Sequence, residues 1–75
     1  MKAIVTYSDI TNEQVSEILV KEYSGLEKAY IPENGKVIVV YSELEHDHVE
    51  FKVTEVQVLV DREFDKFDVL LKRTN

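Results

Sequence analysis

The spacing of hydrophobic and polar positions changes several times along the 75-residue chain and divides it into short segments. Residues 2–7 (KAIVTY) are rich in β-branched side chains and partly alternate, which predicts a first strand. Residues 27–31 predict a short strand, and PENG at 32–35 is typical of a turn. Residues 36–41 (KVIVVY) then predict the second arm of a hairpin, and their unbroken apolar run suggests a central strand covered on both faces.

A helical pattern separates the first strand from this hairpin. Thr11 followed three residues later by Gln14 fits a capping box, and Gly25 is suited to the position just after a helix. Between them the apolar residues form one stripe at helical spacing: Val15, Ile18, Leu19 and Tyr23. The sequence therefore predicts an amphipathic helix over residues 12–24.

Residues 49–60 (VEFKVTEVQVLV) alternate in two different registers. The apolar residues are odd-numbered up to Val53 and even-numbered from Val56 onward. In a regular strand these two sets would face opposite sides of the sheet. We therefore expect a β-bulge or kink near Thr54 and Glu55, which would return both sets to one face.

The C-terminal segment, residues 61–75, fits two structures. Phe64, Phe67, Leu70 and Leu71 follow helical spacing, whereas Phe67, Val69 and Leu71 alternate as in a strand. Acidic residues early and basic residues late favour the helix. The expected fold is α+β: a single domain over residues 1–75, with a mixed or antiparallel sheet of about four strands packed on one N-terminal helix, in the order β-α-β-β-β followed by a C-terminal helix.

Composition narrows the class of protein. The chain lacks cysteine, which excludes disulfides and thiolate metal sites, and no apolar run is long enough for a signal peptide or a membrane span. A cytoplasmic protein is expected. A core this small supplies little net stability, and association with a second copy would add to it. The sequence is compatible with a monomer or a homodimer.

The net charge of −6 is concentrated in one part of the chain. Residues 43–68, called the acidic segment below, contain nine acidic and three basic residues, whereas the rest of the chain contains six of each. The basic residues that interrupt the segment are Lys52, Arg62 and Lys66. This distribution argues against direct contact with nucleic acid or an anionic membrane and favours a basic partner.

Residues 42–50 (SELEHDHVE) combine histidines with carboxylates and raise two chemical alternatives. His46 and His48, with Asp47, Glu45 and Glu43, could supply nitrogen and oxygen ligands to a metal, although a third and fourth ligand at a recognisable spacing are missing. A catalytic carboxylate pair would need an apolar cleft, which these polar surroundings do not indicate. We expect no enzyme activity and no cofactor. Glu43, Glu45 and Asp47 have the same odd numbering as the apolar residues Val49 and Phe51, so one regular strand would bury the acids with them. The chain should therefore turn near residues 44–48 and leave the acids in an exposed loop.

The TNEQVSEIL, PENG, SELEHDHVE and DREFDKFD stretches, in a small acidic chain without cysteine, resemble the host-takeover proteins of lytic Bacillus phages. The resemblance is to a member that inhibits the bacterial nucleoid protein HU by imitating DNA. The resemblance implies a catalytically inert inhibitor that is located in the host cytoplasm, at the nucleoid. It would contact the basic DNA-binding surface of the HU dimer and displace DNA. The residues that would make this contact are Glu43, Glu45, Asp47, Glu50, Asp61, Glu63, Asp65 and Asp68.

Two other functions remain open from the sequence. One is a phage inhibitor of host RNA polymerase or transcription, which would use an exposed apolar patch. The other is a small metal-binding or ligand-binding regulatory domain centred on His46, Asp47 and His48.

Overall fold

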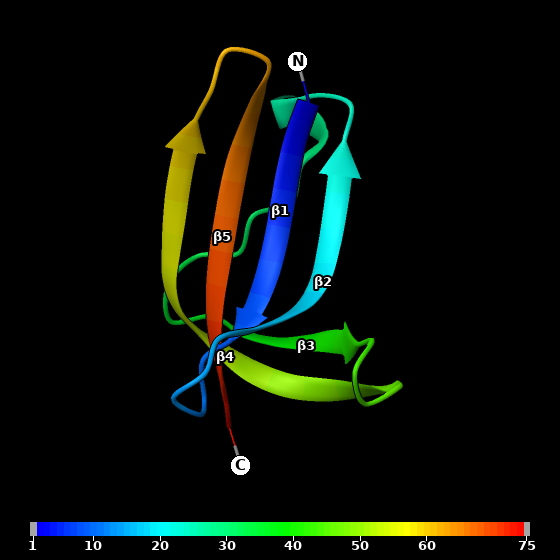
Figure 1. Cartoon of the computed structure of the whole chain (residues 1–75), viewed down its shortest axis with the longest axis vertical. Helices are drawn as coiled ribbons and strands as arrows, with labels where there is room; N and C mark the ends of the chain where they lie inside the picture. The colour runs from blue at the N-terminus through cyan, green and yellow to red at the C-terminus, as the bar shows by residue number, and fades with distance from the viewer. Residues whose placement is uncertain (1, 75) are drawn as a thin grey trace.

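The computed structural model describes residues 2–74, which form a single curled sheet resembling half of a barrel (Figure 1). The sheet order is β2-β1-β5-β4-β3, with β1 and β5 parallel and the other pairs antiparallel. The elements are β1 (Lys2–Asp9), β2 (Ser16–Tyr23), a short 3-10 turn η1 (Leu26–Lys28), β3 (Val37–Ser42), β4 (Asp47–Val60) and β5 (Phe64–Arg73).

The expected α+β class is wrong, because no α-helix occurs within residues 2–74. The segment predicted as the N-terminal helix contains β2 instead. Thr11 does not cap a helix: its hydroxyl donates to Asp9 and accepts a hydrogen bond from the Arg73 amide at 2.9 Å. An isolated helix of this length is marginal in water, so pairing with the edge of β1 decides the structure. A bulge between Tyr7 and Ser8 accommodates the pairing.

The C-terminal helix is also wrong, and the alternating pattern that competed with it describes the structure. Phe67, Val69 and Leu71 of β5 are buried. The strand lies at the centre of the sheet, and its backbone is hydrogen-bonded to β1 on one edge and to β4 on the other. Its alternating apolar side chains face the core. The helical spacing was a coincidence of apolar residues on both faces of one strand.

The hairpin predicted around PENG is partly wrong. Residues 27–31 form no strand; they contain the end of η1 and an extended segment in which Ile31 and Ala29 pack against the core. Gly35 adopts a φ of 86° in the turn before β3, and its amide donates to the carbonyl of Val53 at 2.7 Å. The strand predicted at residues 36–41 is present as β3, but it is an edge strand rather than a covered central one.

Two local predictions are confirmed. The first strand is present as β1, and the register of β4 against β5 shifts between Val53 and Glu55, where the parity change required a bulge. The bulge keeps Val53 and Val56 on one face, opposite Leu71 and Val69. It also lies where β4 passes from pairing with β3 to pairing with β5 alone.

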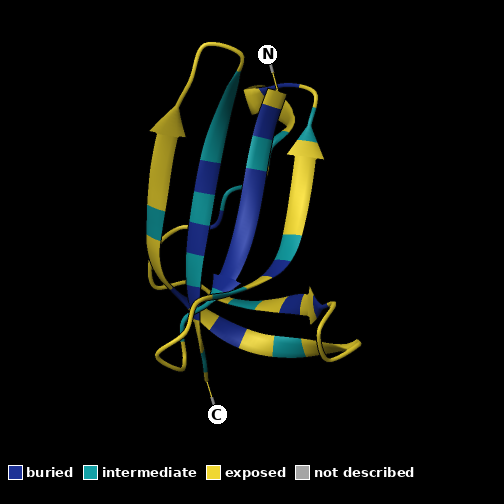
Figure 2. Ribbon diagram, viewed as in Figure 1, coloured by how far each residue is buried: buried dark blue, intermediate teal, exposed yellow. Residues whose placement is uncertain are grey.

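The core lies inside the curl of the sheet, where β3 and the first half of β4 turn toward the opposite strands (Figure 1). Figure 2 shows that burial is concentrated on β1 and β5, while β2 and the second half of β4 are largely exposed. Val60 at the end of β4 is 81% exposed. The buried hydrophobic residues are Ala3, Val5, Tyr7, Ile18, Val40, Phe51, Val53, Phe67, Val69 and Leu71.

Candidate functional site

The first group of predicted acids lies in and beside the turn between β3 and β4. The chain turns over residues 43–46, close to the exposed loop expected near residues 44–48. His46 takes a φ of 55° in this turn. Glu43 and Asp47 are exposed, and Asp47 Oδ1 accepts a hydrogen bond from the His48 amide at 2.8 Å. This local bond holds the Asp47 carboxylate at the start of β4, with its second oxygen open to a partner.

Arg73 partly neutralises this group. Its guanidinium pairs with Glu45, and its Nε lies 3.7 Å from Asp9 Oδ2 at the end of β1. No sequence pattern links these three residues, because the sheet brings together segments far apart in the chain. Glu45 therefore contributes to holding the β3–β4 turn against the rest of the sheet and presents less net charge than Glu43 and Asp47.

Glu50 is exposed on β4, and its Oε1 accepts a hydrogen bond from the Thr74 hydroxyl at 3.0 Å. It belongs to the same end of the molecule as the β3–β4 turn. With Glu43 and Asp47 it gives this end three exposed carboxylates that form no ion pair within residues 2–74.

The second group lies around the turn between β4 and β5. Asp61 and Glu63 are exposed, and Asp61 Oδ1 accepts a hydrogen bond from the Arg62 amide at 2.6 Å. Asp65 and Asp68 belong to β5 and are half-buried, and Asp68 lies 3.9 Å from the Lys66 ammonium. Asp61 and Glu63 are therefore the most available charges of this group.

The structure brings the predicted acids together in two groups rather than one. The β4–β5 turn lies at the top of Figure 1 and the β3–β4 turn at the lower right, because β4 runs between them. The molecule measures 37 Å along its longest axis. That length is similar to one turn of B-DNA, about 34–36 Å.

The histidines do not form part of a clustered ligand set. No group of three or more His, Asp or Glu side chains within residues 2–74 is arranged to hold a metal ion. The His48 ring packs edge-on against Tyr41, its cross-strand partner, with 5.4 Å between ring centroids. This contact gives His48 a packing role beside Tyr41 on the β3–β4 hairpin.

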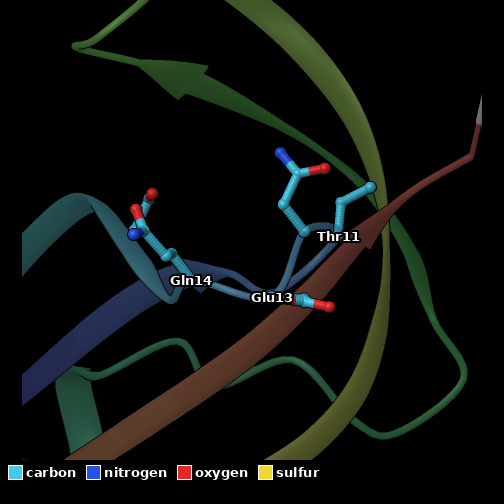
Figure 3. Close-up of a pocket in the computed structure, with 5 residues that line it drawn as sticks. Thr11, Glu13 and Gln14 are labelled. Carbon is cyan, nitrogen blue, oxygen red and sulfur yellow. The ribbon is translucent and has the colours of Figure 1, made fainter.

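The loop between β1 and β2 forms an open depression lined by polar side chains. Figure 3 shows Thr11, Glu13 and Gln14 spread along this loop, with Thr11 and Gln14 on opposite sides of Glu13. All three are exposed. The side chains do not converge on a common point, so this depression does not have the geometry of a catalytic or metal site.

A groove between β2 and β3 was not predicted. It has a volume of about 430 Å³ and is lined by all four tyrosines of the chain. Tyr7 is buried in the core, whereas Tyr30 and Tyr41 are 50% and 40% exposed. Tyr23 could have been placed in the groove only by reading residues 16–23 as a strand, in which Leu19, Lys21 and Tyr23 share one face.

Comparison of the chain with protein-family models, curated proteins and solved structures found no match. Within residues 2–74 there is no helix long and apolar enough to cross a membrane.

Proposed function

We propose that the protein is an acidic interaction protein that occupies the DNA-binding surface of a basic DNA-binding protein and so displaces DNA. The observation that supports this most is the position of the exposed carboxylates at both ends of the long strand β4, over a molecule 37 Å in length. Carboxylates can pair with the lysine and arginine side chains that otherwise bind phosphates. The resemblance to phage host-takeover proteins makes the nucleoid protein HU the first partner to test.

Electrostatic association predicts a strong dependence on salt. The Debye length is about 8 Å at physiological ionic strength and shortens as salt is added. Exposed charges lose most of their attraction once this length falls below their separation. Binding to HU and displacement of DNA from HU should therefore weaken as salt is raised to several hundred millimolar. The measurement is a competition assay, in which HU holding a labelled duplex is titrated with the protein at several salt concentrations.

A pair of charge-reversal variants separates position from net charge. Glu43→Lys with Asp47→Lys changes the β3–β4 turn, whereas Glu13→Lys with Glu17→Lys makes the same change in charge outside the acidic segment. We expect the first variant to lose about tenfold in competition and the second to stay within about twofold of the parent protein. Equal losses in the two variants would reduce the effect to net charge and reject a defined binding surface.

The transcription-inhibitor alternative has one supporting observation. Val58, Leu59 and Val60 at the end of β4 are 56%, 51% and 81% exposed, and this half of β4 has no neighbouring strand on one edge within the described chain. An apolar edge of this kind suits contacts that tolerate salt. Capture of RNA polymerase from host lysate at high salt, lost in a Val58→Lys variant, would favour this function over the acidic one.

A further inference from the structure

The curled sheet leaves a groove between its two edge strands. β2 and β3 end the sheet order, and they approach at one end, where the Glu43 amide donates to the Ile18 carbonyl at 3.5 Å. Beyond this point no backbone pairing between β2 and β3 is present within the described chain. The groove of about 430 Å³ occupies this gap and is called the tyrosine groove below.

The lining of the tyrosine groove is aromatic and apolar, with hydroxyl groups at intervals. It includes Leu19, Ile38 and Val40, together with Tyr7, Tyr23, Tyr30 and Tyr41. Burial, with smaller contributions from Tyr23 and Tyr30, raises the pKa of Tyr7 from 10.0 to about 12. Its hydroxyl therefore stays protonated to a higher pH than that of an exposed tyrosine. No hydrogen bond formed within residues 2–74 uses a tyrosine hydroxyl, so these groups are available to a ligand.

The charge around the groove is opposite to that of the whole molecule. None of the described residues that line it is acidic, although 15 of the 75 residues in the chain are. Lys21 contributes a cation to the lining, and the Lys36 ammonium lies 5.6 Å from the centre of the Tyr30 ring. His48 adds a second basic side chain to the lining, and these groups favour an anionic ligand in the groove.

We propose that the tyrosine groove binds a small aromatic anion, with its ring against the tyrosines and its acidic group near Lys21. The volume lies within the range of ligand pockets, roughly 300–1,000 Å³. Aromatic side chains in the lining favour a planar aromatic ligand, and tyrosine hydroxyls can donate to its acidic oxygens. The proposal does not depend on the function proposed above, although His48 of the groove lies next to Asp47 at the start of β4.

The test compares a charged probe with a neutral one of similar shape. Anilinonaphthalene sulfonate carries the sulfonate that Lys21 would pair with, and phenylnaphthylamine lacks it. We expect saturable binding of the sulfonate by fluorescence, about fivefold weaker in Lys21→Gln. Lys72 is an exposed lysine of β5 outside the groove, so the Lys72→Gln variant should bind the sulfonate probe as the parent protein does. The neutral probe should bind the parent more weakly and be insensitive to Lys21→Gln.

The location of the probe is checked on the parent protein by NMR. Methyl resonances of Leu19, Ile38 and Val40 should shift on addition of the sulfonate, while those of Val58 and Val60 at the exposed end of β4 should not. Shifts confined to the β4 valines, non-saturable binding, or equal affinity of Lys21→Gln and Lys72→Gln would each overturn the proposal. Thermal denaturation of both variants confirms that a loss of binding is not a loss of folding.

Discussion

Tyr7 couples the stability of the fold to alkaline pH. It is 5% exposed at the base of the tyrosine groove, and burial raises its pKa to about 12 from 10.0. The unfolded chain therefore loses this proton at a lower pH than the folded chain, and between these values the folded state binds more protons. Stability contributed by the protonated hydroxyl is present below pH 10 and is lost as pH rises toward 12.

The expected result is an additional fall in the free energy of unfolding between pH 10 and pH 12, which a Tyr7→Phe variant does not show. The measurement is urea denaturation of both proteins across this range, with tyrosinate absorbance recorded on the folded protein. Tyr23 and Tyr30 also ionise in both proteins, and their coupling to Tyr7 is a smaller effect than burial. Parallel stability curves for the two proteins would show that Tyr7 ionises equally in the folded and unfolded states.

At the scale of elements, the bulge in β4 determines which face each half of the strand buries. Thr54 is the extra residue, because the pairing passes from Val53–Leu71 directly to Glu55–Leu70. Deleting Thr54 alone would leave a regular strand with Val53 and Val56 still on one face, whereas deleting Thr54 and Glu55 together would place Val56 directly after Val53 and turn it to the outer side. Deletion of both residues should therefore lower the free energy of unfolding by about 2 kcal/mol or more. Thr54→Ala keeps the bulge and removes only the hydroxyl bond to the Leu70 carbonyl, 3.1 Å long, so it should cost about 1 kcal/mol.

Urea denaturation of the two variants measures both costs. Equal stabilities would mean that the second half of β4 adjusts its register freely, in which case the parity of residues 49–60 does not control the fold. A larger cost for the deletion, with an unchanged dependence on urea, indicates that the same surface is buried by a less stable sheet.

The same elements show what the sequence could predict and where it failed. The bulge was predictable because parity within one strand is a local property. The same argument predicted an exposed turn near residues 44–48, and the structure has it at residues 43–46. The helix predictions for residues 16–23 and 64–73 were wrong because the apolar residues there fit both the helical and the strand period. The choice between helix and strand depends on β1, which pairs with β2 on one edge and β5 on the other. Of the predicted acids, Glu45 and Asp68 form ion pairs, and the Arg73 partner of Glu45 could not be inferred without the sheet order.

At the scale of the whole molecule, β4 separates two acidic ends, and we expect the partner of the proposed function to contact both. A partner that binds DNA along a basic surface would contact carboxylates at either end of the 37 Å molecule. Asp61→Lys with Glu63→Lys reverses charge at the β4–β5 turn and leaves the β3–β4 turn unchanged. We expect about a tenfold loss of competition against HU-bound DNA, similar to that of Glu43→Lys with Asp47→Lys.

Combining the two pairs tests whether one partner spans both ends. If it does, the four substitutions together should weaken competition more than either pair, and the salt dependence should flatten in the same order, because fewer charge pairs are screened. Glu13→Lys with Glu17→Lys again controls for net charge. If the Asp61 and Glu63 pair behaves like this control, the second end takes no part in binding, and the interface is confined to the β3–β4 hairpin.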